Sequence, residues 1–207
     1  LTYVTIGNSV TSIGNSAFSS CYKLCVTEYT GDVAGWCKIK FSFVNSNPMS
    51  NTWNNSQRTL IINGKEIENL VIPNTVDSIH NYAFSGCSSL TSITLPEGVT
   101  EIGNDAFSDC SSLTSITSIN VTPPSIGNSD TFDGVDKSIP VYVPKQSVEA
   151  YKSAEYWKDF TNIQGIDDTP ISDVVADSVS IRLIGNSLIV EGAESYAVYA
   201  FSGQCLG

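Results

Sequence analysis

The sequence predicts a repeat solenoid, a fold in which short coils of the chain stack on one another. The stretch from Leu90 to Leu113 repeats the stretch from Ile67 to Leu90, which gives coils of about 23 residues. Each unit also alternates apolar and polar residues over a few positions, which is typical of a short strand. A unit this short cannot bury its own apolar face, so equivalent residues of successive coils must form one continuous core.

Composition narrows the classes of function. The chain has 207 residues, 41% of them hydrophobic and 15% charged, and a formal net charge of −11. This negative charge disfavours nucleic acid as a partner, and the hydrophobic content excludes a disordered chain. No apolar run approaches the roughly 18 residues of a membrane span. No basic segment precedes an apolar stretch, so we expect an export signal to lie outside these residues.

The repeat holds position by position. Val76 matches Val99, and Cys87 matches Cys110. The pattern L-x-x-I-x-L predicts a short strand that proline ends, and V-x-x-I predicts the returning strand. Residues 104–108 then predict a tight helical or 3₁₀ corner. The N-terminal segment has the same spacings, with equivalent residues at Leu1, Val4, Ile6, Val10, Ile13, Ala17, Phe18, Cys21 and Leu24.

The neighbouring coils are less regular. After Leu113 the pattern slips, because Ile119, Ile126 and Phe132 fall one to two residues late. Between Leu24 and Ile67 an insertion disguises a further coil. There the phase of the repeat places Phe41 at the Phe18 position and Val44 at the Cys21 position, with Leu24, Val33 and Trp36 also in phase.

An insertion with a hairpin is expected over 42–66. Asn63-Gly64 between two apolar runs is a strong signal for a type I′ turn, because both central residues need a positive φ. The polar loop before it, 45–58, is the one long irregular segment and so the best place for specific recognition. In the alternative, the loop folds back over the core with Trp53 buried. Its candidate binding residues are Asn51, Trp53, Asn54 and Asn55.

The C-terminal part is expected to close the stack. A helical cap is predicted over 145–160, with Val148, Tyr151, Ala154 and Trp157 along one stripe. A linker is expected at 165–172. A small β segment, 173–207, should then hold three short strands at 178–183, 187–190 and 196–201.

The units LTSITLPEGVTEIGNDAFSDCSS and VIPNTVDSIHNYAFSGCSS resemble the BspA-type leucine-rich repeat of anaerobic host-associated bacteria. The resemblance covers roughly residues 1–166. It implies a curved right-handed horseshoe, export to the cell surface or medium, a role in adhesion and no catalytic residues. The C-terminal GNSLIVEGAESYAVYAFSGQ also resembles the start of a sorting domain of the same bacteria. In that case the domain is truncated; otherwise the segment is a small β appendage.

Few residues suggest chemistry. Cys87 and Cys110 share a small apolar repeat position, which favours free thiols, although bridges between these two or between Cys25 and Cys37 stay open. The single histidine, His80, stands in a slot that other coils fill with glycine, so we interpret it as a corner substitution. The acidic stretch 130–136 is interpreted as a solvated turn, since it lacks the glutamate of a calcium loop. We expect no catalytic residue, metal or cofactor.

The outward strand positions form rows that are polar and almost uncharged. They contain no aromatic row for sugars and no arginine row for phosphate, so binding there would use a broad surface. We expect a non-enzymatic repeat protein that binds a host or matrix protein or glycoprotein, with a monomer favoured. A structural spacer is the alternative, and a hydrolase a remote one. The candidate residues on this face are Tyr3, Glu28, Asn69 and Thr94.

Overall fold

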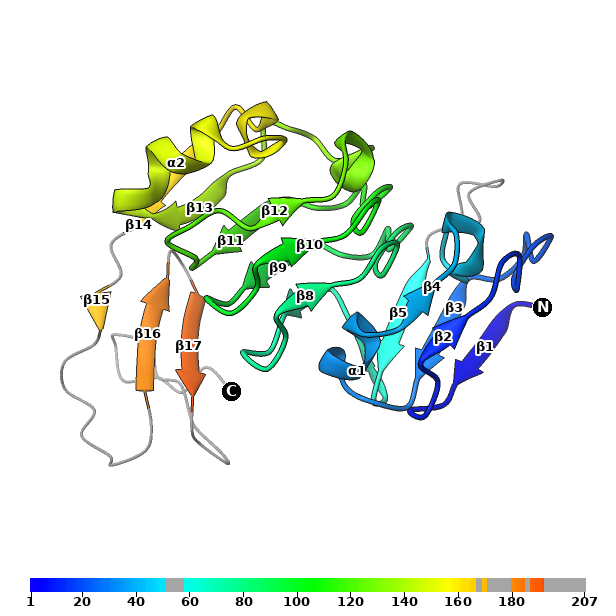
Figure 1. Cartoon of the computed structure of the whole chain (residues 1–207). Helices are drawn as coiled ribbons and strands as arrows, with labels where there is room; N and C mark the ends of the chain where they lie inside the picture. Colours follow the sequence, from blue (N-terminus) through cyan, green and yellow to red (C-terminus); the bar gives the residue numbers. More distant parts are fainter. Residues whose placement is uncertain (51–57, 167–168, 171–179, 185–186, 192–207) are drawn as a thin grey trace. The chain divides into compact units, whose positions relative to one another are not determined.

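The computed structural model describes residues 1–50, 58–166, 169–170, 180–184 and 187–191 (Figure 1). The chain divides into two compact units, Leu1–Gly165 and Ile166–Gly207, and each is treated by itself. One continuous cluster of buried side chains runs through the first unit from Ile6 to Ile163. The first unit is therefore a repeat solenoid with a shared core.

The first strand of each coil, which we call the forward strand, belongs to one of two sheets, and the first of these sheets also includes the antiparallel β6. The first sheet has the order β1-β3-β5-β6, and the second has the order β14-β13-β11-β9-β7. In the second sheet Asn69 pairs with Ser92, and Ser92 with Ser115, so partners occupy the same position in successive repeats. The strands are β1 (Tyr3–Ile6), β3 (Val26–Tyr29), β5 (Thr59–Ile62), β6 (Lys65–Glu66), β7 (Asn69–Val71), β9 (Ser92–Leu95), β11 (Ser115–Ser118), β13 (Val141–Pro144) and β14 (Ile163–Ile166).

Shorter strands return along the other side of each coil, and we call them the return strands. β2 pairs with β4, and β8, β10 and β12 form a separate sheet, all in parallel. Each has only two residues, of which the second points into the core. The return strands are β2 (Ser12–Ile13), β4 (Lys40–Phe41), β8 (Ser78–Ile79), β10 (Glu101–Ile102) and β12 (Ser125–Ile126).

Aromatic rings stack through the middle of the solenoid. Phe84 lies parallel to Phe107 with ring centroids 5.3 Å apart, and Phe107 lies parallel to Phe132 at 5.5 Å. Phe132 thus keeps its place in the stack although it comes late in the sequence pattern. Ile126 comes late as well and still pairs with Ile102. Neighbouring coils therefore tolerate an extra residue or two where their loops can bulge.

The corner at 104–108 is a run of turns and not the expected helical or 3₁₀ segment. Backbone amides of Ala106 and Ser108 donate to the carbonyls three residues earlier, but the run is interrupted because Asp105 and Asp109 have φ of 53° and 58°. Aspartate tolerates this left-handed conformation better than most residues do. In the next coil the equivalent corner is a 3₁₀ helix, η2 (Ser129–Phe132).

The predicted register of the second coil is wrong. Phe41 pairs with Ile13, and it therefore takes the isoleucine position and not that of Phe18. The cause is a short helix, α1 (Val33–Cys37), which Asp32 caps by accepting from the amide of Gly35 at 2.7 Å. Val44 does not reach the Cys21 position either. It is 36% exposed and begins the 3₁₀ helix η1 (Val44–Ser46).

The hairpin of the insertion changes the stacking of the sheets. β5 extends the first sheet beside β3 and then turns through Asn63 and Gly64, with φ of 49° and 75°, into the antiparallel β6. The chain then enters β7, which begins the second sheet. The coil that starts with β5 therefore makes a hairpin where the coils of β1, β3, β7, β9 and β11 make a return strand.

The residues on either side of 51–57 are part of the core. Met49 is 1% exposed and lies against Cys87, and Gly86 leaves no room for a side chain, because a Cβ there would lie 2.1 Å from the carbonyl oxygen of Met49. Arg58 is 3% exposed, and its guanidinium donates to the carbonyl of Leu24 at 2.9 Å. Met49 and Arg58 therefore pack between the second coil and residues 83–88.

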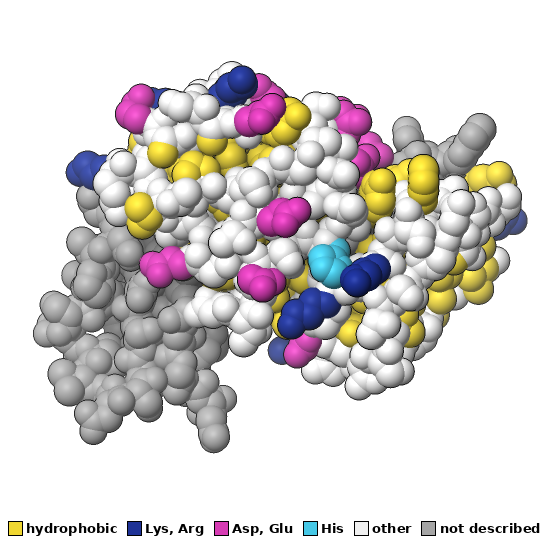
Figure 2. All heavy atoms as spheres, viewed as in Figure 1, with side chains coloured by type: hydrophobic (Ala, Val, Ile, Leu, Met, Phe, Trp, Pro, Cys, Tyr) yellow, Lys and Arg dark blue, Asp and Glu magenta, His cyan; other side chains and the backbone are white. Residues whose placement is uncertain are grey.

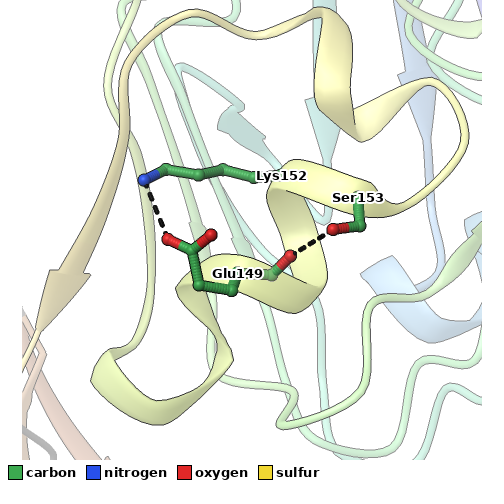
Figure 3. A network of polar contacts seen from close by, with 3 residues as sticks. All are labelled: Glu149, Lys152 and Ser153. Carbon is green, nitrogen blue, oxygen red and sulfur yellow. Dashed lines mark hydrogen bonds and ion pairs between the residues drawn. The ribbon is translucent and has the colours of Figure 1, made fainter.

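The cap consists of three short pieces in place of one helix. They are η3 (Lys145–Ser147), α2 (Val148–Ser153) and η4 (Trp157–Asp159), and the helix ends because Ala154 is extended and Tyr156 has φ of 64°. Tyr151 and Trp157 nevertheless point inward and are fully buried. On the outer side Lys152 pairs with Glu149 at 3.1 Å, and Ser153 donates to the carbonyl of Glu149 (Figure 3).

Two strands occupy parts of the predicted linker at 165–172. β14 runs to Ile166, and β15 (Thr169–Pro170) belongs to the second unit. In that unit β15 pairs antiparallel with β16 (Ser180–Ile184), and β16 with β17 (Ser187–Glu191). The third expected strand, 196–201, lies outside the described residues. The resemblance of this segment to a sorting domain stays a prediction.

Candidate functional site

The outward face of the first sheet places an acid among hydroxyl groups. Thr5 and Glu28 are direct cross-strand partners. The Tyr3 hydroxyl donates to Oε2 of Glu28, and the Thr5 hydroxyl donates to the same oxygen at 3.5 Å. The hydrogen bond to Glu28 raises the pKa of Tyr3 above its ordinary value, and Tyr3 is 45% exposed. This face therefore offers an aromatic ring beside a carboxylate whose orientation is fixed.

On the second sheet, hydroxyl and amide groups are linked across strands. The side-chain oxygen of Asn69 accepts from the hydroxyl of Ser92 at 2.7 Å and from that of Thr91 at 3.2 Å. Asn69 itself is exposed, so this ordered amide lies at the surface. In the next row Val71 pairs with Thr94 and is 57% exposed. The result is a neutral surface with fixed donors beside an apolar side chain.

The predicted outward rows are divided between these two sheets. The repeat spacing predicts that Val71 follows Glu28 in one outward row and that Asn69 follows Val26 in the next. In the structure Glu28 instead has Ile61 as its next neighbour, and Val26 has Thr59. Tyr3 and Glu28 therefore belong to one face, and Asn69 and Thr94 to another. The remaining candidates, Asn51, Trp53, Asn54 and Asn55, lie outside the described residues.

A hollow separates the two sets of return strands. β4 is the last strand of its sheet and β8 the last of the other. Between them is a space of about 440 Å³, which we call the slot. On the face drawn in Figure 2, Lys or Arg side chains lie next to the histidine, with acidic side chains nearby. The slot is lined by Lys40, Phe41, Ser78, Ile79, His80, Asn81, Glu101 and Gly103.

His80 in this slot was interpreted from the sequence as a corner substitution, and its surroundings were not foreseen. Its Nδ1 atom is buried and has no hydrogen-bond partner within the described part of the chain. Its backbone amide donates to the carbonyl of Cys37, at the end of α1, at 3.1 Å. The sequence offered one signal for this site, a histidine at a repeat position where other coils have glycine. Lys40 could not be predicted as its neighbour, because the predicted register of the second coil was wrong.

The five described cysteines, Cys21, Cys25, Cys37, Cys87 and Cys110, are free thiols. Neither of the two bridges left open by the sequence is formed. Burial, followed by the charge of Asp32, raises the pKa of Cys37 to about 12, and burial also raises the pKa values of Cys87 and Cys110. These buried thiols act as small apolar side chains in the stack.

The acidic stretch 130–136 is only partly the solvated turn that was predicted, because it begins within η2 and its residues Thr131, Phe132 and Val135 are buried. Asp136 accepts from the backbone amide of Ser138 at 2.8 Å, and this hydrogen bond lowers the pKa of the carboxyl. Within the described ranges, no group of three or more His, Cys, Asp and Glu side chains is arranged to hold a metal ion. Among those residues, too, none of the helices combines the length and apolar character that a membrane crossing requires.

Comparison with known proteins identifies the repeat. The family model of the BspA type leucine rich repeat region matches residues 1–52 and 61–169 in six copies. No curated protein matches the chain. One similar solved structure is a leucine rich cell surface protein from Faecalibacterium prausnitzii A2-165, with 19% sequence identity and a TM-score of 0.32. The match covers 80% of this chain and 60% of that one. Since the family model covers more than half of its residues, this chain belongs to the BspA-type leucine-rich repeat family.

Proposed function

We propose that this protein is a non-enzymatic repeat protein, exported to the cell surface or the medium, which binds a host or matrix protein or glycoprotein through the outward face of its second sheet. The observation that carries this proposal is the hydrogen-bonded row of Asn69 and Ser92 beside the exposed Val71. A neutral face with fixed donors and an apolar side chain suits a broad protein or glycan surface better than it suits a small charged ligand.

The geometry of this row supports binding with little loss of conformational freedom. Asn69 accepts two hydrogen bonds from Thr91 and Ser92, so its side chain is ordered before a partner arrives. An ordered donor loses less entropy on binding than a free side chain does. The row itself, Asn69 and Ser92, carries no charged side chain, and we assign the net charge of −11 to solubility.

The proposal is tested by binding the whole chain to immobilised matrix proteins and mucins. A double variant, Asn69→Ala with Val71→Ser, should lower the affinity by about ten-fold or more if this face is the contact. Lys152→Ala on the outer side of α2 is the matched control, because its ion pair with Glu149 is exposed and distant from the row in sequence. Both variants should keep the wild-type unfolding midpoint.

Unchanged affinity of a folded double variant would contradict the assignment to this face. Binding to none of the matrix proteins and mucins would favour the structural spacer instead. A further variant that removes residues 51–57 asks whether the loop with Trp53 contributes. If only this deletion abolishes binding, the recognition surface is the loop and the proposal for the second sheet is wrong.

A further inference from the structure

The slot between β4 and β8 lies where a return strand is missing from the stack. Every described coil with a forward strand from β1 to β11 has a return strand after it, except the coil of β5, which turns into the β6 hairpin. The return strands therefore run β2-β4 and then β8-β10-β12, with no pairing between β4 and β8. Two strand edges thus face each other across a space that the repeat would otherwise fill.

The glycines at the repeat position of His80 show independently that this position is open in the coil of β8. A Cβ on Gly103 would lie 2.5 Å from the amide nitrogen of Asn81, and one on Gly127 would lie 2.6 Å from that of Asn104. Where another coil packs in front of it, this repeat position has no room for a side chain. A Cβ on Gly14, in the first coil, would have no neighbour within 4 Å. His80 can carry an imidazole in this position because no return strand lies before β8.

The floor of the slot is closed, so it is a groove and not a hole into the core. Trp36, Cys37 and Ile39 are fully buried around the end of α1. The indole of Trp36 donates to the carbonyl of Ala83 at 2.8 Å, and the carbonyl of Cys37 accepts from the amide of His80. These bonds join the second coil directly to the coil of β8. What stays open is the space above them, along the two strand edges.

Charges on the rim restrict what can enter. Lys40 from β4 and Glu101 from β10 are both exposed, and neither forms an ion pair within the described part of the chain. A strand added beside β4 would place one of its side chains directly next to Lys40, as Ser12 lies on the other side. An acidic side chain in that place forms a favourable cross-strand pair.

We propose that the slot binds an extended peptide as an added strand between β4 and β8, with an acidic side chain of the peptide against Lys40. Main-chain hydrogen bonds to the edge of β4 supply affinity, because the amide of His80 after β8 already donates to the carbonyl of Cys37. The pair with Lys40 sets the register. Asn81 and His80 lie at the end where the peptide leaves the slot. This site is separate from the outward face of the second sheet, so the two proposals fail independently.

The probe is a capped synthetic peptide with the sequence of residues 97–104, EGVTEIGN, which is a return strand of this protein with a central glutamate. It is titrated into the ¹⁵N-labelled full chain. The amides of Phe41 and Ser78 should shift, while those of Thr94 and Thr117 should not. The same peptide with N-methyl groups on every second residue should bind about ten-fold more weakly, because it loses main-chain donors.

A charge exchange separates this site from a general affinity for peptides. Lys40→Glu should weaken the glutamate peptide about ten-fold and should favour a peptide with lysine at its central position. Lys65→Glu, on the exposed β6, is the matched control and should change neither affinity. Both variants alter an exposed side chain and should fold as the wild type does.

Three results would overturn the proposal. The N-methylated peptide could bind as well as the parent, or the shifts could occur along β1, whose outer edge is also unpaired. Alternatively, mucin oligosaccharides could shift Lys40, His80 and Glu101 while the peptide does not, which would assign the slot to sugars. None of these results would alter the binding predicted for Asn69 and Val71.

Discussion

Phe84 and Phe107 lie face to face in the centre of the stack, with their planes 4° from parallel. Phe132 continues this contact on the other side of Phe107, and all three side chains are buried. The contact links three coils through one equivalent position. It shows how a short unit that cannot fold alone becomes stable by repetition.

Removing the middle ring should be costly. Phe107→Ala is expected to lower the free energy of unfolding by about 3–5 kcal/mol, because it leaves a cavity between two rings that the stack holds apart. Urea titration followed by tryptophan fluorescence measures this loss. Phe43→Ala is the control, since that ring is 57% exposed. A loss below about 1 kcal/mol for Phe107→Ala would contradict the central place of this ring.

Glycines at the same repeat position should respond differently in coils with different neighbours. Gly103→Ala should destabilise the protein by about 1–3 kcal/mol, because its Cβ would meet the backbone of Asn81 and His80 at less than 3 Å. Gly14→Ala should be nearly neutral, since nothing lies within 4 Å of that position. Equal thermal midpoints of the two variants would show that coils do not stack there as described.

The indole of Trp36 joins two coils that are separated by the hairpin. It donates to the carbonyl of Ala83 and packs edge-on against Tyr29, with ring centroids 5.4 Å apart. Trp36→Phe removes the donor and part of the ring, so we expect the free energy of unfolding to fall by about 1–3 kcal/mol. An unchanged urea midpoint would mean that the amide of Asn47, which also reaches Ala83, suffices alone.

Alkaline stability should depend on a buried thiol. The pKa of Cys37 is raised from 9.0 to about 12, so the folded protein favours the neutral thiol. The stability it contributes is fully present below pH 9 and is lost as the pH rises toward 12. Between these values the unfolding free energy of Cys37→Ala should fall less steeply than that of the wild type, by up to about 1.4 kcal/mol per pH unit. Parallel curves would contradict this prediction.

Much of this fold could be predicted because its core is periodic. Ile79, Ile102 and Leu113 are buried as the repeat requires, and Asn63-Gly64 forms the turn that its residue types favour. The cap was predicted as one helix because its inward residues recur at a helical spacing. The left-handed φ of Tyr156 breaks that helix while Trp157 still reaches the core.

The second coil escaped prediction because its helix imitates the phase of the repeat. Val33 and Trp36 match the expected spacing, yet they belong to α1, which shifts Phe41 from the Phe18 position to the Ile13 position. The pairing of β5 with β3 was missed for a related reason. The first strand of a hairpin can join one sheet while its second strand turns back and takes the place of a return strand. The local sequence does not specify which sheet the first strand will join. The slot and its residues depended on both of these points.

The hydrogen bond between the amide of Thr59 and the carbonyl of Cys25, at 2.9 Å, tests the central claim most directly. It exists only if β5 completes the first sheet and leaves the slot between β4 and β8 without a strand. The measurement is the scalar coupling across hydrogen bonds in deuterated, ¹³C,¹⁵N-labelled protein. We predict a coupling from the nitrogen of Thr59 to the carbonyl carbon of Cys25. A coupling from the nitrogen of Asn69 to that carbon would place β7 beside β3 and contradict the account.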